Sequence, residues 1–295
     1  MNLAISMSLS LFQVLILAAV QGAAELLPVS SSAHVVIAEK LMGADPSAPE
    51  MTLLLVMLHT GTMFAVVVYF WNRWQKTYLQ NAVTCKRFAI LAVLATAVSG
   101  VIGEISIKVL ERVVFPGQTN VDVEQLFSHL ELIAPALAAA GILILVAGLA
   151  EKKSAARPSS DQIRINQAGL IGAVQGLCFP FRGFSRSGAT ISTGMLAGIS
   201  KETAENFSFA LAVILTPPVT AREAFRLIRA ERIDTDAHLA LAVLPSLIGA
   251  GCAFVAGLLA LKWLSRWLER GRWYLFGVYC LLASGAVALL HRAGY

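Results

Sequence analysis

The chain has 295 residues, of which 57% are hydrophobic and 14% are charged, and its formal net charge is +5. Soluble domains carry charge on about a quarter of their residues, so this composition excludes an ordinary soluble domain and indicates an integral membrane protein. The lysines and arginines fall mainly in short segments between apolar runs. We therefore expect them to set membrane topology and to contact anionic headgroups rather than nucleic acid.

Residues 1–20 are apolar, but no lysine or arginine precedes or interrupts them. A cleaved signal peptide normally begins with a positively charged region. We therefore expect this stretch to remain in the protein, where it leads directly into the first of two polar segments.

The first polar segment runs from residue 21 to residue 34 and reads QGAAELLPVSSSAH. The apolar runs around it, 9–20 and 26–43, are short, and Pro28 interrupts the second. A helix that crosses the bilayer needs about 20 apolar residues, so these runs favour a re-entrant helix pair. Non-helical backbone at membrane depth is tolerated where protein covers it or where it lines a cavity.

Six further runs are predicted to span the membrane, the fourth being shorter than the others. They are 53–71, 88–110, 132–150, 207–221, 237–261 and 273–290. The second polar segment, 175–190, reads QGLCFPFRGFSRSGAT and lies between the short apolar runs 168–179 and 189–199. Pro180 interrupts it, so the sequence predicts a second re-entrant pair there.

The two polar segments resemble each other. Each opens with Val-Gln-Gly, at 20–22 and 174–176, and ends in Ser-x-Ser followed by a small residue, about 154 residues apart. Each half then holds one re-entrant pair and three spans, and because three is odd the second half must be inverted. We predict an all-α polytopic membrane protein with a single domain, 1–295, built from inverted repeats of approximately 1–150 and 151–295.

Loop charges give the orientation. Loops 72–87 and 151–167 are basic and are expected on the cytoplasmic side, whereas the acidic loop 111–131 and both termini are expected outside. Segment 222–236 then falls outside although it is rich in arginine, against the rule. Its arginines recur at helical spacing and either extend a helix or face a lipid phosphate; they are Arg222, Arg226, Arg229 and Arg232.

Ionisable residues inside membrane segments are expensive and are functional candidates by default. Gln21 and Glu25 are four residues apart and would share one face of a helix. Their oxygens could hold a hard cation such as Mg²⁺ with help from water and substrate phosphates, or could hydrogen-bond between helices. His34, beyond a serine triplet, is a candidate nucleophile or proton shuttle.

The second segment offers the groups of an anion site. Arg186 supplies a guanidinium fork for phosphate oxygens. The hydroxyls beside it, and glycines that let backbone N–H groups approach an anion, suit a helix N-terminus. The alternative is a seam of small residues for helix packing, which leaves Arg186 unexplained.

With these motifs, and with residues 63–71 (MFAVVVYFW) and 207–213 (FSFALAV), most of the chain resembles the bacterial undecaprenyl pyrophosphate phosphatase family. The resemblance implies a multi-pass enzyme of the bacterial inner (cytoplasmic) membrane that removes the terminal phosphate of a C55 isoprenyl diphosphate. The product is the monophosphate that carries cell-wall intermediates. The resemblance also implies a divalent cation, Mg²⁺ or alternatively Ca²⁺, and a polyprenyl diphosphate lipid as partner; a homo-oligomer stays open.

Carried over by motif, the resemblance assigns Glu25 and Gln21 to metal or diphosphate binding. Ser31 and His34 become the catalytic serine and histidine, and either could attack phosphorus. Glu25 and Arg186 complete the catalytic set. The other residues expected to bind the diphosphate are Gln21, Ser185, Ser187, Thr190 and Arg182.

Several positions depart from the family pattern. Gln21 stands where Glu is often found, Ala33 where Gly usually precedes the histidine, and Arg182 where Pro is usual. Asn206 and Ile214 occupy places where Glu and Pro are expected. These departures leave open a paralogue that acts on another lipid diphosphate, and Arg182 either strengthens phosphate binding or pairs with a headgroup.

Two other classes fit parts of the pattern. An inverted repeat with a midplane site is also transporter architecture, so the chain could flip a polyprenyl phosphate lipid, and such a transporter needs no nucleophile. An anion channel could use the arginine and glycines as a filter, but Glu25 would repel anions there.

Overall fold

The structure is a computed structural model that describes residues 10–44, 49–114, 130–153, 160–230, 236–268 and 272–293. The described residues are almost entirely helical, with one isolated bridge between Ser160 and Ile199. The helices are α1 Leu11–Leu26, α2 Ser31–Leu41, α3 Pro49–Thr77, α4 Ala82–Val114, α6 Leu130–Lys153, α7 Ile165–Leu177, α8 Arg186–Leu196, α9 Lys201–Ala230, α10 Asp236–Leu268 and α11 Tyr274–Arg292. The all-α prediction is confirmed.

Five described helices are long and apolar enough to cross a membrane: α3, α4, α6, α10 and α11. They contain five of the six runs predicted as spans. The sixth run, 207–221, lies inside the 30-residue α9, which includes Pro217 and Pro218. Because α9 continues to Ala230, the arginines from 222 to 229 extend a helix, which was one of the two alternatives expected for them. Arg232 and most of the 111–131 loop lie outside the described residues.

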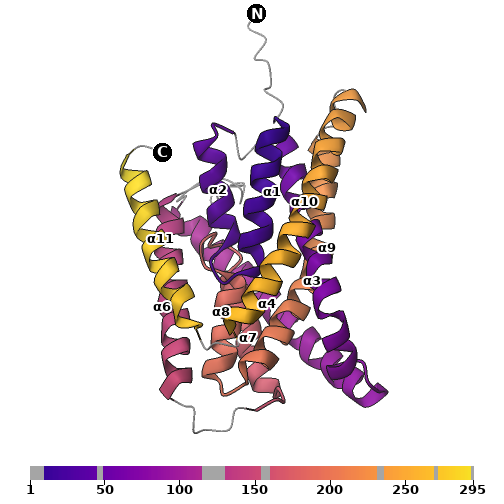
Figure 1. Cartoon of the computed structure of the whole chain (residues 1–295), viewed down its shortest axis with the longest axis vertical. Coiled ribbons are helices and arrows are strands. Elements are labelled where there is room, and N and C mark those ends of the chain that lie inside the picture. Colours follow the sequence, from indigo (N-terminus) through magenta and orange to yellow (C-terminus); the bar gives the residue numbers. More distant parts are fainter. Residues whose placement is uncertain are drawn as a thin grey trace, which may run out of the picture.

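The two polar segments each form a pair of short helices, α1 with α2 and α7 with α8. Ser10 caps α1 through a capping box with Gln13, and the segment containing Pro28 separates α1 from α2. In Figure 1 the indigo α1 and α2 occupy the upper half of the molecule, and α7 and α8 occupy the lower half. The turns of the two pairs therefore meet near the middle of the molecule.

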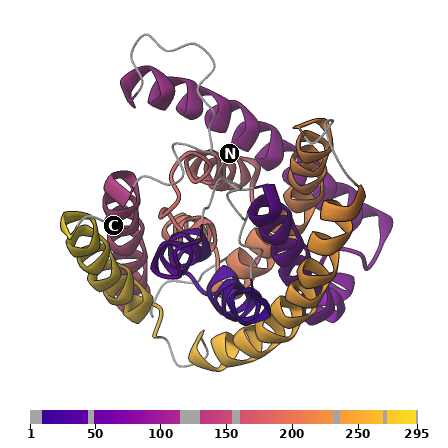
Figure 2. The ribbon, with the colours of Figure 1, turned by 90° about the horizontal axis from the view of Figure 1, so that it is seen from above.

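Seen from above, α1 and α2 lie inside a ring of longer helices (Figure 2). In that ring α10 packs along α3 and α11 packs along α6, while α1 packs on α10 and α7 packs on α4. Each short pair is thus supported by a long helix from the other half of the chain.

Two glycines allow this close packing. A Cβ on Gly22 would lie 2.7 Å from the Ala253 carbonyl oxygen of α10, and one on Gly176 would lie 2.6 Å from the Ser99 carbonyl oxygen of α4. Both glycines come from the Val-Gln-Gly motifs. Gly22 and Gly176 are 154 residues apart, and the residues that they contact, Ala253 and Ser99, are also 154 residues apart.

Candidate active site

Glu25, in the last turn of α1, is the centre of the site. Arg186 donates from Nη2 to Glu25 Oε1 at 2.7 Å, and the carboxylate side chain is only 14% exposed. Gln21 donates from Nε2 to Oε2 at 3.0 Å, and Ser31 donates its hydroxyl to the same oxygen. His59 Nε2 of α3 lies 3.7 Å from Oε2. The structure therefore brings Gln21, Glu25, Ser31 and Arg186 together, although Glu25 and Arg186 are 161 residues apart.

Arg186 is the first residue of α8, and Ser185 caps this helix by accepting from the Gly188 N–H at 3.2 Å. A cation at a helix N-terminus opposes the helix dipole, which favours anions there. Glu25 supplies the compensating negative charge in this structure. The same position, a helix N-terminus with an arginine, is suited to a bound phosphate.

Ser30 and Ser31 shape the start of α2. Ser30, the N-cap, has φ +67° and is the one non-glycine residue in the described ranges with a positive φ. This left-handed conformation is uncommon for residues with a side chain, and such outliers cluster at functional sites. It turns the chain sharply after Val29, so that α2 begins at Ser31 against the Glu25 carboxylate.

His34 lies one turn into α2 and has its own partners. Its Nδ1 is 2.7 Å from the Ser30 carbonyl oxygen, and its Nε2 is 2.6 Å from the hydroxyl of Tyr279 on α11. A carbonyl oxygen can only accept, so Nδ1 carries the hydrogen. In the neutral ring Nε2 therefore has the free lone pair, and the Tyr279 hydroxyl donates to it. The two rings also stack, with centroids 5.7 Å apart.

The remaining hydroxyls of the second segment hold the two helix pairs together. Ser187 donates to the Leu27 carbonyl oxygen at 3.3 Å, across the junction of the pairs. Thr190 donates to the Arg186 carbonyl oxygen at 2.8 Å and lies 2.6 Å from the Ser208 hydroxyl of α9. Both side chains are buried, so in this structure they position the start of α8.

The charge of Arg182, in the turn before α8, acts on Glu39 of α2. Glu39 is fully buried, with 0% exposure. An arginine in this turn thus offsets a buried carboxylate on the other helix pair. This arrangement accounts for the positive charge at a position where the resembling family usually has proline, and a role in diphosphate binding stays a prediction.

The metal prediction rests on Gln21 and Glu25. The described residues contain no group of three or more His, Cys, Asp or Glu side chains arranged for a metal. The Gln21 Oε1 atom, however, is buried and has no hydrogen-bond partner. An amide oxygen and a carboxylate are donors that hard divalent cations accept. Gln21 here turns Nε2 toward Glu25, and rotation of its amide would bring Oε1 to that side, so the chemistry of these two residues fits such an ion.

Three residues at the site were not predicted from the sequence: His59, Tyr279 and Ser208. His59 lies within a predicted span, and the rule that singled out Glu25 and His34 as intramembrane ionisable residues would also have found it. Tyr279 and Ser208 are ordinary residues of apolar helices, and no local pattern marks them.

The chain matches the profile of the family described as "Bacitracin resistance protein BacA" over residues 14–286. It is 57% identical to undecaprenyl-diphosphatase 2 of Acinetobacter baylyi, over 97% of this chain and 99% of that protein. It is 34% identical to undecaprenyl-diphosphatase of Rhodopirellula baltica, over 95% of this chain and 98% of that protein. It is 32% identical to undecaprenyl-diphosphatase 2 of Burkholderia thailandensis over 94% and 95%. The chain therefore belongs to the bacitracin resistance protein BacA family.

Proposed function

We propose that this protein is an integral-membrane phosphatase that hydrolyses undecaprenyl diphosphate to undecaprenyl phosphate and phosphate, and so recycles the lipid carrier for cell-wall synthesis. The observation that carries the proposal is the Glu25–Arg186 ion pair, which joins the two polar segments at one partly buried centre. The relatives named as undecaprenyl-diphosphatases support it, since they match this chain over nearly its full length.

Substrate binding follows from the charges. Phosphoryl transfer depends mainly on positioning and on neutralising the phosphate oxygens. The Arg186 guanidinium and the N-terminal N–H groups of α8 would bind the terminal phosphate, with Ser185, Ser187 and Thr190 holding that helix end in place. The isoprenyl chain would stay in the bilayer while its headgroup reaches the centre.

We assign the attack on phosphorus to Ser31, because its hydroxyl already donates to Glu25. As the serine oxygen bonds to the terminal phosphorus, its proton passes to the Glu25 carboxylate. The anhydride bond breaks and the lipid monophosphate leaves. Water then attacks the phosphoserine, Glu25 returns its proton to the departing serine oxygen, and phosphate is released with the hydroxyl restored.

His34 would act at the second stage. Its lone pair at Nε2 is oriented by the Nδ1 contact to Ser30 and by the Tyr279 hydroxyl. Because this lone pair already accepts from Tyr279, the ring would take up the proton by relay: the Tyr279 hydroxyl passes its proton to Nε2 as it receives one from the attacking water. If His34 were itself the nucleophile, the phosphate would be carried on nitrogen rather than on oxygen, which distinguishes the two assignments chemically.

A divalent cation, Mg²⁺ or alternatively Ca²⁺, would be held by Glu25 and the free Gln21 oxygen. When bound, such an ion neutralises charge on phosphate oxygens and polarises the phosphorus. The amide of Gln21 contributes no negative charge, so the protein supplies a single carboxylate there and the substrate phosphates would complete the ligand set.

For the membrane we propose six spans, α3, α4, α6, α9, α10 and α11, with α1–α2 and α7–α8 as re-entrant pairs in the inner membrane. The inverted repeat is supported by the reciprocal packing of α1 on α10 and α7 on α4. It is also supported by the constant separation of 154 residues between equivalent packing positions.

The test is phosphate release from undecaprenyl diphosphate by purified protein in detergent with Mg²⁺, beside EDTA, Arg186→Ala and His34→Ala. We expect release to need the metal and to fall by roughly 10² or more in both variants. Absence of release by folded wild-type protein would contradict the proposal. A flippase would instead move a labelled polyprenyl phosphate across liposomes and keep that transport in Ser31→Ala and His34→Ala.

Trapping with substrate labelled on the terminal phosphate tests the nucleophile. Phosphoserine survives acid, whereas phosphohistidine does not. We expect an acid-stable label in His34→Ala, where water attack is slowed, and no label in Ser31→Ala. An acid-labile label that persists in Ser31→Ala would show that His34 is the nucleophile.

A further inference from the structure

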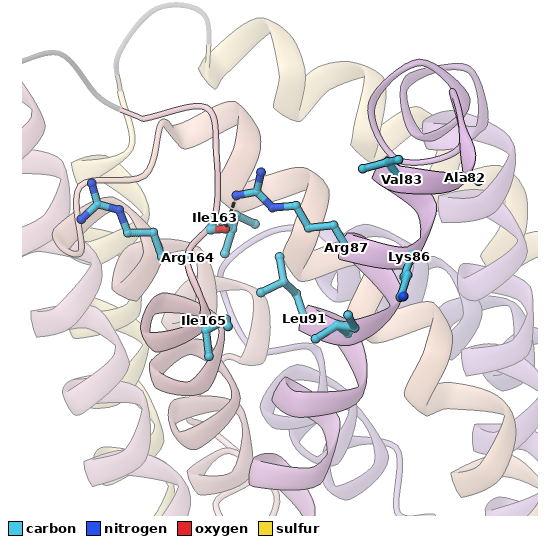
Figure 3. Close-up of a pocket in the computed structure, with 9 residues that line it drawn as sticks. Ala82, Val83, Lys86, Arg87, Leu91, Ile163, Arg164 and Ile165 are labelled. Atoms are coloured by element: carbon cyan, nitrogen blue, oxygen red, sulfur yellow. Dashed lines mark hydrogen bonds between the residues drawn. The ribbon is translucent and has the colours of Figure 1, made fainter.

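A groove of about 690 Å³ lies between the N-terminal end of α4 and the segment that leads into α7 (Figure 3). None of its lining residues belongs to the Glu25 centre. The lining residues are Ala82, Val83, Lys86, Arg87, Ile90, Leu91, Ile163, Arg164 and Ile165. Three of them are basic and none is acidic.

Arg87 is fixed across this groove. It donates to Gln162 Oε1 and to the Ile163 carbonyl oxygen, both at 3.1 Å, and so joins α4 to the segment before α7. Figure 3 shows it between the two walls, with Lys86 on the α4 side and Arg164 extending beyond the opposite wall. Lys86 and Arg164 are exposed and form no ion pair with a described residue.

The nearby carboxylate is directed elsewhere. Asp161 lies three residues before Arg164, but it accepts from the Ser200 hydroxyl at 2.7 Å, at the start of α9. The positive charge of the groove is therefore not balanced by its own lining.

The other part of the groove is apolar and follows a membrane helix. Val83 and Ile90 are 77% and 52% exposed. A second hollow of about 500 Å³ shares Lys86 and Ile90 with the first and continues along α4 past Val93, Leu94 and Ala97. Because α4 is apolar enough to cross a membrane, this second hollow faces the acyl region.

We propose that these two hollows form a binding site for an anionic phospholipid, separate from the catalytic centre. The headgroup phosphate would lie at the basic end of the groove, near Lys86 and Arg87, Arg164 would add to the positive potential, and an acyl chain would follow α4 to Ala97. Basic pockets between membrane helices on the cytoplasmic side are suited to anionic headgroups. A soluble anion would make no use of the apolar hollow, and a zwitterionic lipid would leave the basic charge uncompensated.

The experiment is native mass spectrometry of the purified full chain, titrated with phosphatidylglycerol and with phosphatidylcholine of the same acyl chains. We expect phosphatidylglycerol to bind at least about fivefold more tightly than phosphatidylcholine. The double variant Lys86→Gln with Arg164→Gln should lower phosphatidylglycerol affinity by about thirtyfold, since each basic residue near the surface contributes about 1 kcal/mol. Arg87 is left intact because it holds the fold.

Two matched controls complete the design. Lys76→Gln with Lys262→Gln removes the same charge from exposed residues outside the groove, and should leave phosphatidylglycerol affinity within about twofold. Ala97→Trp should weaken binding of both lipids by filling the apolar hollow, whereas Val101→Trp, one turn further along α4, should not. Millimolar inorganic phosphate should fail to displace the lipid.

Equal affinity for the two lipids would overturn the proposal. An equal loss of phosphatidylglycerol affinity in the Lys76/Lys262 control variant would also overturn it. So would unchanged lipid binding in both the Lys86/Arg164 and the Ala97→Trp variants, or full displacement of the lipid by inorganic phosphate. Phosphate release from undecaprenyl diphosphate is measured in parallel on every variant; we expect it to persist, and it shows that the variants are folded independently of lipid binding.

Discussion

At the residue scale, the Glu25 carboxylate accepts hydrogen bonds from three side chains. Arg186, Gln21 and Ser31 all donate to it, with Oε1 taken by the arginine and Oε2 by the other two. A substrate phosphate that draws Arg186 toward itself would leave Glu25 free to take the serine proton. In the proposed mechanism the ion pair would therefore link substrate binding to activation of Ser31, and this link would depend on the forked guanidinium.

Arg186→Lys tests that dependence. Lysine keeps the positive charge and can still pair with Glu25, but it cannot form a bidentate contact to phosphate. We expect the fold to be retained and kcat/KM for undecaprenyl diphosphate to fall by roughly 10²-fold. Steady-state kinetics beside a thermal melt of the detergent-solubilised protein checks this. Near-wild-type turnover of the lysine variant would mean that charge alone is sufficient.

Tyr279→Phe tests the orientation of His34. Phenylalanine preserves ring stacking but removes the hydroxyl that donates to Nε2, so the imidazole loses one of its two fixed contacts. We expect kcat to fall by about tenfold with KM nearly unchanged, and stability to fall by about 1 kcal/mol. Tyr274→Phe, on the same helix, is the control, because Tyr274 contacts Lys152 instead. Equal effects of the two variants would remove Tyr279 from the mechanism.

Side-chain partners were the part of the site that sequence predicted least. Gln21, Glu25, Ser31 and Arg186 stand in unusual polar segments, so their types and spacing mark them in the sequence. Tyr279 acts through one hydroxyl on an otherwise apolar helix, 245 residues from His34. Such a contact depends on how α11 packs beside α2, and no local pattern carries that information.

At the scale of elements, the sequence predicted the two interrupted helix pairs because proline and polar residues break otherwise apolar runs. The first apolar run ends at residue 20, but the spacing of Gln21 and Glu25 indicated that the helix continues past it, and α1 does extend to Leu26. Gln21 and Glu25 lie one turn apart and hydrogen-bond to each other. Side-chain spacing therefore carried information about the helix that hydropathy did not.

Gly22→Ala and Gly176→Ala test the packing of these short helices. The added methyl groups would meet the backbone carbonyl oxygens of Ala253 and Ser99, which cannot move without shifting α10 or α4. We expect each variant to lose about 1–3 kcal/mol of stability. Gly169→Ala is the control on α7, because nothing lies within 4 Å of its added Cβ. Differential scanning fluorimetry gives the comparison, and equal melting points for all three would contradict close packing at the Val-Gln-Gly motifs.

At the scale of the whole molecule, the two halves are interlocked. The first half supplies Glu25, Ser31 and His34, and the second supplies Arg186 and Tyr279. Since α1 rests on α10 and α7 rests on α4, neither half can complete the site or cover its own short helices. Two motifs in the sequence predict the repeat, whereas this exchange of partners could not be predicted from them, because it is a property of the assembled helices.

The orientation of this assembly in the membrane is testable with a native probe. Cys85 is exposed just inside the N-terminal end of α4, in the basic loop expected on the cytoplasmic side, and Cys280 is buried. A membrane-impermeant maleimide should therefore label Cys85 in inside-out vesicles and not in right-side-out vesicles.

Arg292→Cys in a Cys85→Ser background should give the opposite result, because the exposed end of α11 is expected outside. The same orientation would place the groove beside Lys86 and Arg87 at the cytoplasmic leaflet, where anionic lipid attracts basic segments. Labelling of both cysteines from the same side would contradict the positive-inside assignment, and with it the leaflet in which the proposed lipid site lies.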